Sequence, residues 1–332
     1  MKSIEEIKKN YPTIYSILGE SYIEKLKGEQ GALAKRATIN PFFEILYMND
    51  KNGIESVFSK AVSANAISIE RLKRFREEKD NINIQNFINE ITVLTPMLES
   101  GSFLDETNEK VTPDFLGQIN GEEVVFECVS VNESNNSQKQ RNLDVKNTQE
   151  QLKKWKKTNP NGGVFTTFHE NAPFDTIDVE KIIEKIKTKK SSRQVKGYQY
   201  KVMVMSFQNM SFLLRSHECL PNTSNHNDGI HSGIIFNAFY GRRGDLIFES
   251  NSFEGEKHKI KRIKSDGRFI RDSDYNLCIL QFATEKNETY KKYVFFENLK
   301  KPLPEAITNS LCDKFSPYST HSLLNKYCVN ST

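Results

Sequence analysis

The chain has 332 residues, of which 37% are hydrophobic and 27% are charged. No apolar run approaches the roughly 18–20 residues that span a bilayer, and the charged N-terminus has no secretory apolar core, so we expect a cytoplasmic protein without a membrane segment. Five cysteines without CxxC spacing fit a reducing compartment.

The net charge of +4 decides little by itself, but its distribution is uneven. Residues 139–157 and 256–271 each carry seven Lys or Arg against two acids, and residues 181–201 carry eight against one. Such segments are typical of a protein that presents a cationic face to phosphates, although each segment would equally suit a solvated helix face.

The first 80 residues are predicted to form a helical N-terminal region. Ser3 and Glu6 match a capping box, and apolar residues from Ile4 to Leu18 recur at helical spacing. Further helices are predicted at 54–62, 67–79 and 82–100, and Pro96 predicts a kink or an early end in the last one.

Beyond Gly101 the pattern changes to short apolar runs that predict strands. The predicted strands are 111–119, 123–131, 163–168, 201–207, 230–239, 245–249, 276–283 and 293–296. Helices are predicted at 138–157, 177–190 and 302–313. Helices that alternate with strands predict an α/β (α+β) fold with a mixed β-sheet core flanked by helices. We therefore divide the chain into residues 1–80, a core at 81–210 and a β-rich C-terminal extension at 211–332.

One predicted hairpin carries two acids. Asn120-Gly121 stands between two apolar runs, which is the strongest short-range signal for a hairpin. The turn lies near the midpoint between Asp114 and Glu127, so pairing of the strands brings the two carboxylates together. Because neighbouring carboxylates are costly without a cation, the pattern predicts a divalent-metal site.

The order of these elements resembles the PD-(D/E)xK nuclease superfamily over residues 82–168. A helix with Glu90 comes first, then the strand opened by Pro113-Asp114-Phe115, then Val124-Val-Phe-Glu-Cys-Val129, then the helix around residues 146–151. The resemblance implies a restriction-endonuclease-like fold. It also implies a Mg2+-dependent (or Mn2+-dependent) endonuclease that hydrolyses DNA phosphodiester bonds in restriction, phage defence or repair.

The resemblance also implies roles for single residues. Asp114 and Glu127 would be catalytic metal ligands, and Glu90 would complete the metal shell. Val129 occupies the position of the family's lysine, so Lys146 is the candidate for a lysine that has migrated onto the next helix, with Lys139 as a weaker one. Predicted contacts with nucleic acid are Lys139, Arg141, Gln149, Lys153, Lys189, Lys190 and Arg193.

Two alternatives stay open at this point. Val129 favours a degenerate nuclease-fold module that binds nucleic acid or a protein partner without cleavage. An unrelated α/β fold would leave Asp114 and Glu127 far apart. If the chain is a nuclease that cuts both strands of a duplex, a homodimer follows on mechanistic grounds.

Overall fold

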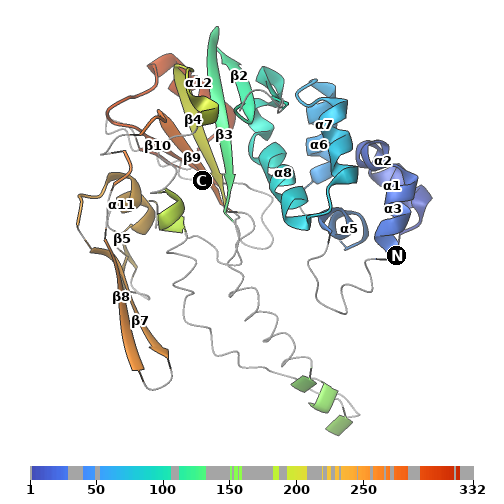
Figure 1. The fold of residues 1–332 in the computed structure, drawn as a ribbon, viewed down its shortest axis with the longest axis horizontal. Helices are drawn as coiled ribbons and strands as arrows, with labels where there is room; N and C mark the ends of the chain where they lie inside the picture. Colours follow the sequence, from blue (N-terminus) through green and yellow to red (C-terminus); the bar gives the residue numbers. More distant parts are fainter. Residues whose placement is uncertain are drawn as a thin grey trace.

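A seven-stranded mixed sheet lies at the centre of the computed structural model, in the strand order β1-β2-β3-β4-β9-β10-β11 (Figure 1). The pairs β3/β4, β4/β9 and β10/β11 are parallel, whereas β1/β2, β2/β3 and β9/β10 are antiparallel. These strands are β1 (Gly101–Phe103), β2 (Phe115–Ile119), β3 (Glu122–Ser130), β4 (Tyr200–Ser206), β9 (Leu277–Phe282), β10 (Lys292–Glu297) and β11 (Ser319–His321).

The structure describes residues 2–28, 40–48, 53–105, 112–131, 150–151, 153–155, 157–158, 182–186, 193–207, 219, 223–225, 229–231, 233–244, 246–254, 257–264, 267–269, 273–282, 292–317 and 319–321. Within these ranges, no helix is both long enough and apolar enough to cross a membrane. The predicted strand 163–168 and most of the predicted helix 138–157 lie outside them.

The N-terminal third is helical, as its apolar spacing predicts. The capping box is confirmed, because the Glu6 amide donates to Ser3 Oγ at 3.1 Å and the Ser3 amide donates to the Glu6 carboxylate at 2.7 Å. The elements are α1 (Ile4–Asn10), α2 (Pro12–Leu18), α3 (Glu20–Lys27), α5 (Pro41–Phe43), the π-helix η1 (Glu44–Met48), α6 (Ile54–Ser63), α7 (Ile69–Glu77) and α8 (Asn81–Val93).

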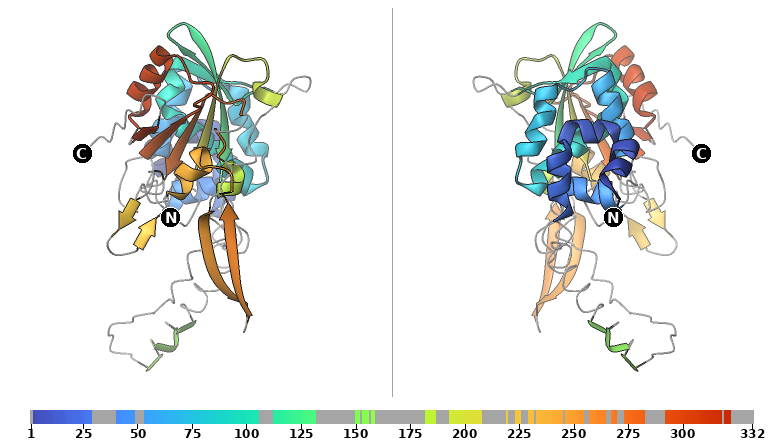
Figure 2. Two further views of the ribbon diagram at one scale, coloured as in Figure 1. Left: turned by 90° about the vertical axis from the view of Figure 1, so that its left-hand side faces the viewer. Right: turned by 90° about the vertical axis from the view of Figure 1, so that its right-hand side faces the viewer.

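These helices cover one face of the sheet and form with it what we name the first core (Figure 2). The C-terminal helix α12 (Glu305–Phe315), close to its predicted range, packs into the same core. Side chains that the sheet contributes alternate along each strand, as expected for one face of a pleated sheet. They are Val124, Phe126, Val202, Val204, Leu277, Ile279 and Phe295.

The opposite face of the sheet carries the second core. Here the intervening strand residues meet helical residues 182–186 and the helix α11 (Ile234–Tyr240). The strand residues of this core are Val125, Val129, Met203, Met205, Cys278, Leu280, Val294 and Phe296. Since β3, β4 and β9 bury side chains on both faces, their sequences read as continuous apolar runs.

The hairpin predicted at Asn120-Gly121 is confirmed. Both turn residues have positive φ, 52° for Asn120 and 82° for Gly121, as a type I′ turn requires. The Asn120 side chain also donates to the Ala306 carbonyl at 2.8 Å, which ties the turn to α12.

The helix predicted over 82–100 ends early. α8 stops at Val93, and a 3-10 helix, η2 (Thr95–Ser100), takes over with Pro96 in its first turn. Proline lacks an amide hydrogen and cannot continue an α-helical ladder, so the predicted early end has its expected cause.

The strand predicted over 230–239 is wrong in its greater part. Residues from Ile234 onward form α11, which follows Gly233 in a left-handed conformation. Its buried side chains are Ile235, Ala238 and Phe239, at helical rather than alternating spacing. Continuous apolarity misled the prediction, because a short apolar run fits a buried helix as well as a buried strand.

Two small hairpins complete the fold. They pair β5 (Thr223–Asn225) with β6 (Gly229–His231), and β7 (Leu246–Glu254) with β8 (Lys257–Lys264). The β7–β8 hairpin extends well beyond the central sheet (Figure 2). The strands β9, β10 and β11, by contrast, join the same sheet as the acidic hairpin.

Candidate functional site

Asp114 and Glu127 lie at the same level of the β2–β3 hairpin. The register pairs Phe115 with Phe126, and Asp114 and Glu127 are the next residues of the two segments beyond that pair, one step further from the turn. The backbone amide of Cys128 donates to Asp114 Oδ2 at 2.6 Å. β2 begins only at Phe115, so no carbonyl of this strand reaches the Cys128 amide. The Asp114 carboxylate accepts the hydrogen bond from that amide instead.

Glu127 is buried, with only 2% of its surface exposed. It lies between Val125 and Val129 on β3, so it faces the second core. The hydroxyl of Tyr275 donates to Glu127 Oε2 at 2.5 Å. A buried carboxylate is costly without hydrogen-bond donors, and Tyr275 supplies one. Burial and the bond to Glu127 together raise the pKa of Tyr275, which keeps its donor proton in place at neutral pH.

A buried arginine lies behind this pair. Arg268 is 2% exposed, and its Nη1 donates to the Ile186 carbonyl. Its guanidinium carbon lies 5.6 Å from the centroid of the Tyr275 ring, and its Nε and Nη2 have no hydrogen-bond partner among the residues that the structure describes. Burial lowers the pKa of Arg268 to about 10, a shift that the charge of Glu127 opposes. Arg268 therefore remains a cation at neutral pH, within electrostatic reach of Glu127.

The backbone holds Arg268 against the end of α11. The Arg268 amide donates to the Ala238 carbonyl at 2.9 Å, and the Gly267 amide donates to the Gly241 carbonyl at 3.1 Å. A Cβ on Gly267 would lie 2.5 Å from the Gly241 carbonyl oxygen. Glycine is therefore needed at 267 to let the two segments approach closely enough to fix Arg268.

Glu90 reaches the same neighbourhood from α8. Its carboxylate lies 3.7 Å from Arg71 Nη2, and these side chains are only 20% and 11% exposed. Arg71 also donates to the Leu104 carbonyl. The guanidinium carbon of Arg71 lies 5.1 Å and 5.4 Å from the ring centroids of Phe87 and Phe103. Arg71 is thus a fixed cation beside Glu90.

Four of these charges, those of Asp114, Glu90, Glu127 and Arg71, act on the thiol of Cys128. Its pKa is raised by burial first, and then by the negative charges of Asp114 and Glu90. Glu127 raises the same pKa further, whereas Arg71 lowers it. The three acids predicted from the sequence therefore act on a single side chain between α8 and the hairpin.

The acid pair is a two-carboxylate donor set. Within the described residues, no group of three or more His, Cys, Asp or Glu side chains could hold a metal ion. Mg2+ takes oxygen ligands and is commonly held by one or two carboxylates together with water and substrate phosphates. The chemistry of Asp114 and Glu127 therefore suits Mg2+ bound together with a phosphate, and suits a closed structural metal site poorly.

The other predicted site residues are distributed differently. Val129 is 7% exposed and belongs to the second core. Because its side chain is a hydrocarbon, it can neither bind metal nor transfer a proton. Lys153 and Arg193 are exposed, the latter on the 3-10 helix η3 (Arg193–Val195). Six predicted residues lie outside the described ranges: Lys139, Arg141, Lys146, Gln149, Lys189 and Lys190.

Sequence reasoning missed Tyr275 and Arg268. Tyr275 is 148 positions from Glu127, and no local pattern connects them. Arg268 falls in the basic segment 256–271, where its charge looks like part of a solvated surface. The one usable signal was Gly267, a glycine directly before Arg268 in a segment that suits a solvated surface.

No protein-family model, curated protein or solved structure matches this chain. The chemistry of the site therefore follows from its own residues.

Proposed function

We propose that the protein is a Mg2+-dependent (or Mn2+-dependent) endonuclease of restriction-endonuclease-like fold that hydrolyses DNA phosphodiester bonds. The observation that carries this proposal is the position of Asp114 and Glu127 at the open end of the β2–β3 hairpin, where Asp114 accepts a hydrogen bond from the amide of Cys128, the residue after Glu127. A mixed sheet with helices on both faces is the setting in which such a pair is expected. Glu90, whose charge also raises the pKa of Cys128, is proposed to assist from α8, beside the two-carboxylate centre.

Each residue has a distinct proposed role. Asp114 and Glu127 would hold the ion, which when bound would polarise a phosphate oxygen and make a bound water more acidic. The Cys128 amide orients Asp114, and the Tyr275 hydroxyl orients Glu127. Holding ligands in place before the reaction is what makes such electrostatic centres effective.

A cation near the reacting water is also part of the proposal. Val129 cannot supply it, so Lys146 remains the proposed water-positioning residue. Lys139, Arg141, Gln149, Lys153, Lys189, Lys190 and Arg193 remain the proposed contacts with DNA, and the exposure of Lys153 and Arg193 supports that role for these two. Cleavage of both strands would use two copies of the chain, and the mass of the protein in solution tests for that homodimer.

The test compares three proteins on supercoiled plasmid DNA with Mg2+ or Mn2+. We expect the wild type to nick or linearise the plasmid, and Asp114→Asn combined with Glu127→Gln to be inactive. Asparagine keeps a side-chain oxygen that can accept the hydrogen bond from the Cys128 amide. The double variant therefore removes both negative charges and preserves this contact at the end of the hairpin. Glu123→Gln is the matched control, because Glu123 is an exposed acid on the same hairpin.

Two outcomes decide the matter. Equal cleavage by the wild type and the double variant would place the chemistry elsewhere. Loss of cleavage in Glu123→Gln as well would point to general damage to the hairpin. DNA binding, measured by fluorescence anisotropy in EDTA, should persist in the double variant.

A second candidate function is a binding module that has lost cleavage. Burial of Val129 in the second core favours it, since a buried hydrocarbon side chain occupies the position at which the PD-(D/E)xK pattern has a lysine. The binding module would be supported if the wild type binds DNA in the anisotropy assay and cleaves plasmid with neither Mg2+ nor Mn2+.

A further inference from the structure

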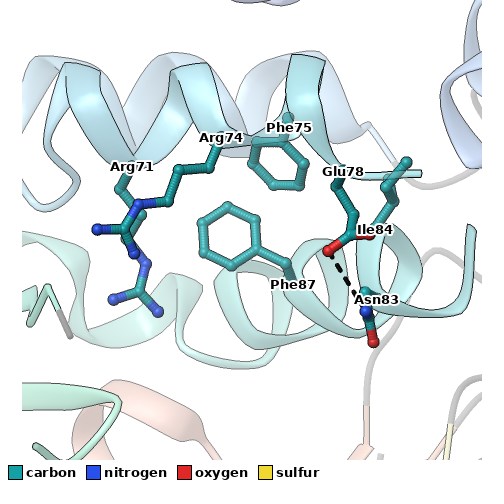
Figure 3. A pocket seen from close by; sticks show the side chains of 7 residues that line it. All are labelled: Arg71, Arg74, Phe75, Glu78, Asn83, Ile84 and Phe87. Atoms are coloured by element: carbon teal, nitrogen blue, oxygen red, sulfur yellow. Dashed lines mark hydrogen bonds between the residues drawn. The ribbon is translucent and has the colours of Figure 1, made fainter. Parts of the chain in front are cut away.

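A cavity of about 200 Å³ lies between α7 and α8, on the helical side of the molecule. It is lined by Arg71, Arg74, Phe75, Glu78, Asn83, Ile84 and Phe87 (Figure 3). Whole small-molecule sites are typically larger, at roughly 300–1,000 Å³. The cavity therefore suits one part of a ligand whose remainder stays outside.

One end of the cavity is cationic. The guanidinium groups of Arg71 and Arg74 lie side by side there (Figure 3). Arg71 is held by Glu90 and by the Leu104 carbonyl, whereas Arg74 is exposed to solvent. Arginine presents donors in a planar fork that matches the oxygens of a phosphate, so this end suits a phosphate group.

The middle of the cavity is aromatic and its far end is polar. The rings of Phe75 and Phe87 lie 4.1 Å apart between centroids, at 58° to each other, and Phe87 is only partly buried. At the far end, Asn83 Nδ2 donates to the Glu78 carboxylate at 3.3 Å. Figure 3 shows the order along the cavity: arginines, phenylalanine rings, then this amide and acid. A flat apolar group with a polar edge fits that order.

We propose that this cavity binds one nucleotide unit of a single-stranded nucleic acid, with its phosphate on Arg71 and Arg74 and its base against Phe87. Stacking of bases on aromatic rings beside a cationic groove is the general way in which proteins hold single strands. The partial burial of Phe87 and the small volume favour one unit of a strand over a whole free cofactor. This inference deepens the proposed function, since it takes a nucleic acid as the ligand.

Arg71 connects the cavity with the candidate site. It lines the cavity, pairs with Glu90 at 3.7 Å and donates to the Leu104 carbonyl, and the Leu104 amide donates to the Asp114 carbonyl at 3.1 Å. A strand seated in the cavity would therefore come close to the acidic hairpin. The cavity would hold an unpaired stretch of the substrate next to the proposed point of cleavage.

The first test measures binding of a fluorescein-labelled eight-nucleotide oligothymidylate by anisotropy in EDTA and low salt, where no cleavage occurs. Arg74→Glu should weaken binding about tenfold or more, because it reverses a charge that faces a phosphate. Lys73→Glu is the matched control, since Lys73 is the preceding residue, is exposed and does not line the cavity. We expect it to weaken binding less than about threefold.

The second test asks whether a base is recognised. An abasic oligomer of the same length should bind the wild type about tenfold more weakly than the oligothymidylate. Phe87→Leu should bind both oligomers equally, because it removes the ring and leaves an apolar side chain. Thermal unfolding of Phe87→Leu accompanies this test. Should the variant prove unfolded, the comparison of the two oligomers on the wild type still decides the question.

Three results would overturn the inference. They are equal weakening by Arg74→Glu and Lys73→Glu, equal binding of both oligomers to the wild type, and competition by thymidine monophosphate as strong as that by unlabelled oligomer. The last result would assign the cavity to a free nucleotide. Failure of the proposed cleavage is a separate finding, because plasmid assays detect it while binding in EDTA remains intact.

Discussion

The acidic hairpin and the α7–α8 cavity differ in how far their charged side chains are exposed to solvent. Glu127 and Arg268 are each 2% exposed, and protein groups alone stabilise them. Arg74 lies in solvent, where water and salt screen its charge. The buried charges at the hairpin therefore affect the stability of the fold even without a ligand. The exposed charge of Arg74 at the cavity affects binding alone. Arg71, which is partly buried beside Glu90, lies between these two cases.

The largest expected effect tests the buried side of this comparison. Arg268→Met removes the cation near Glu127 and leaves a buried carboxylate without it, which should cost about 3–5 kcal/mol in the free energy of unfolding. Urea denaturation followed by circular dichroism measures the loss. Arg243→Met is the control, since Arg243 is exposed. A loss below about 1 kcal/mol would show that Arg268 does not compensate Glu127.

A second variant isolates the charge coupling from the packing. Adding Glu127→Gln to Arg268→Met should recover part of the lost stability, because the uncompensated carboxylate is gone. If the stability losses of the two single variants simply add up in the double variant, Arg268 and Glu127 do not interact energetically.

A smaller loss is expected at the hydroxyl between them. Tyr275→Phe removes the donor to Glu127 Oε2 and should cost about 1–3 kcal/mol. The same urea titration measures it, with the half-buried Tyr198→Phe as control. A variant as stable as the wild type would mean that other groups fully satisfy the carboxylate.

The hydrogen bond of Tyr275 should also affect how the free energy of unfolding depends on pH above neutrality. The folded-state pKa of Tyr275 is raised by burial and by Glu127. Its contribution is therefore complete below the unfolded tyrosine pKa of about 10 and is lost as the pH rises above that value. Between pH 8 and 11, Tyr275→Phe should lose about 1 kcal/mol less stability than the wild type. Parallel curves would contradict this assignment.

The smallest effect concerns the thiol that both regions influence. The pKa of Cys128 is raised by burial and by nearby acids, so alkylation by iodoacetamide at pH 8.5 should be slow in the folded protein. Glu90→Gln removes one of those charges and should speed the reaction about twofold, as mass spectrometry of the labelled peptide would measure. No change in rate would place Glu90 too far away to matter.

The sequence predicted what local patterns control. The Asn120-Gly121 turn, the strand at 123–131 and the capping box at Ser3 each depend on a few neighbouring residues, and the structure confirms all three. The placement of Asp114 and Glu127 one residue beyond the pair Phe115 and Phe126 followed from the turn alone. Boundaries were weaker where a proline or a change of helix type intervened, as at the end of α8.

The rest depended on distant segments. The second core brings Arg268 and Tyr275 to Glu127 across more than 140 positions of sequence, and no periodicity encodes that meeting. The apolar run that became α11 was ambiguous because burial on all sides removes the contrast between helix and strand patterns. Charge counting also failed at Arg268, since composition cannot tell a buried cation from a solvated one.

The bond between Asp114 and the Cys128 amide has an evolutionary consequence. An acid that also finishes a strand is retained by selection on folding, even in a lineage that has stopped using it for chemistry. Glu127 is a carboxylate buried beside the apolar side chains of the second core, and that burial makes it costly to keep. Across descendants of this chain, loss of function should therefore become visible first at position 127, with position 114 unchanged.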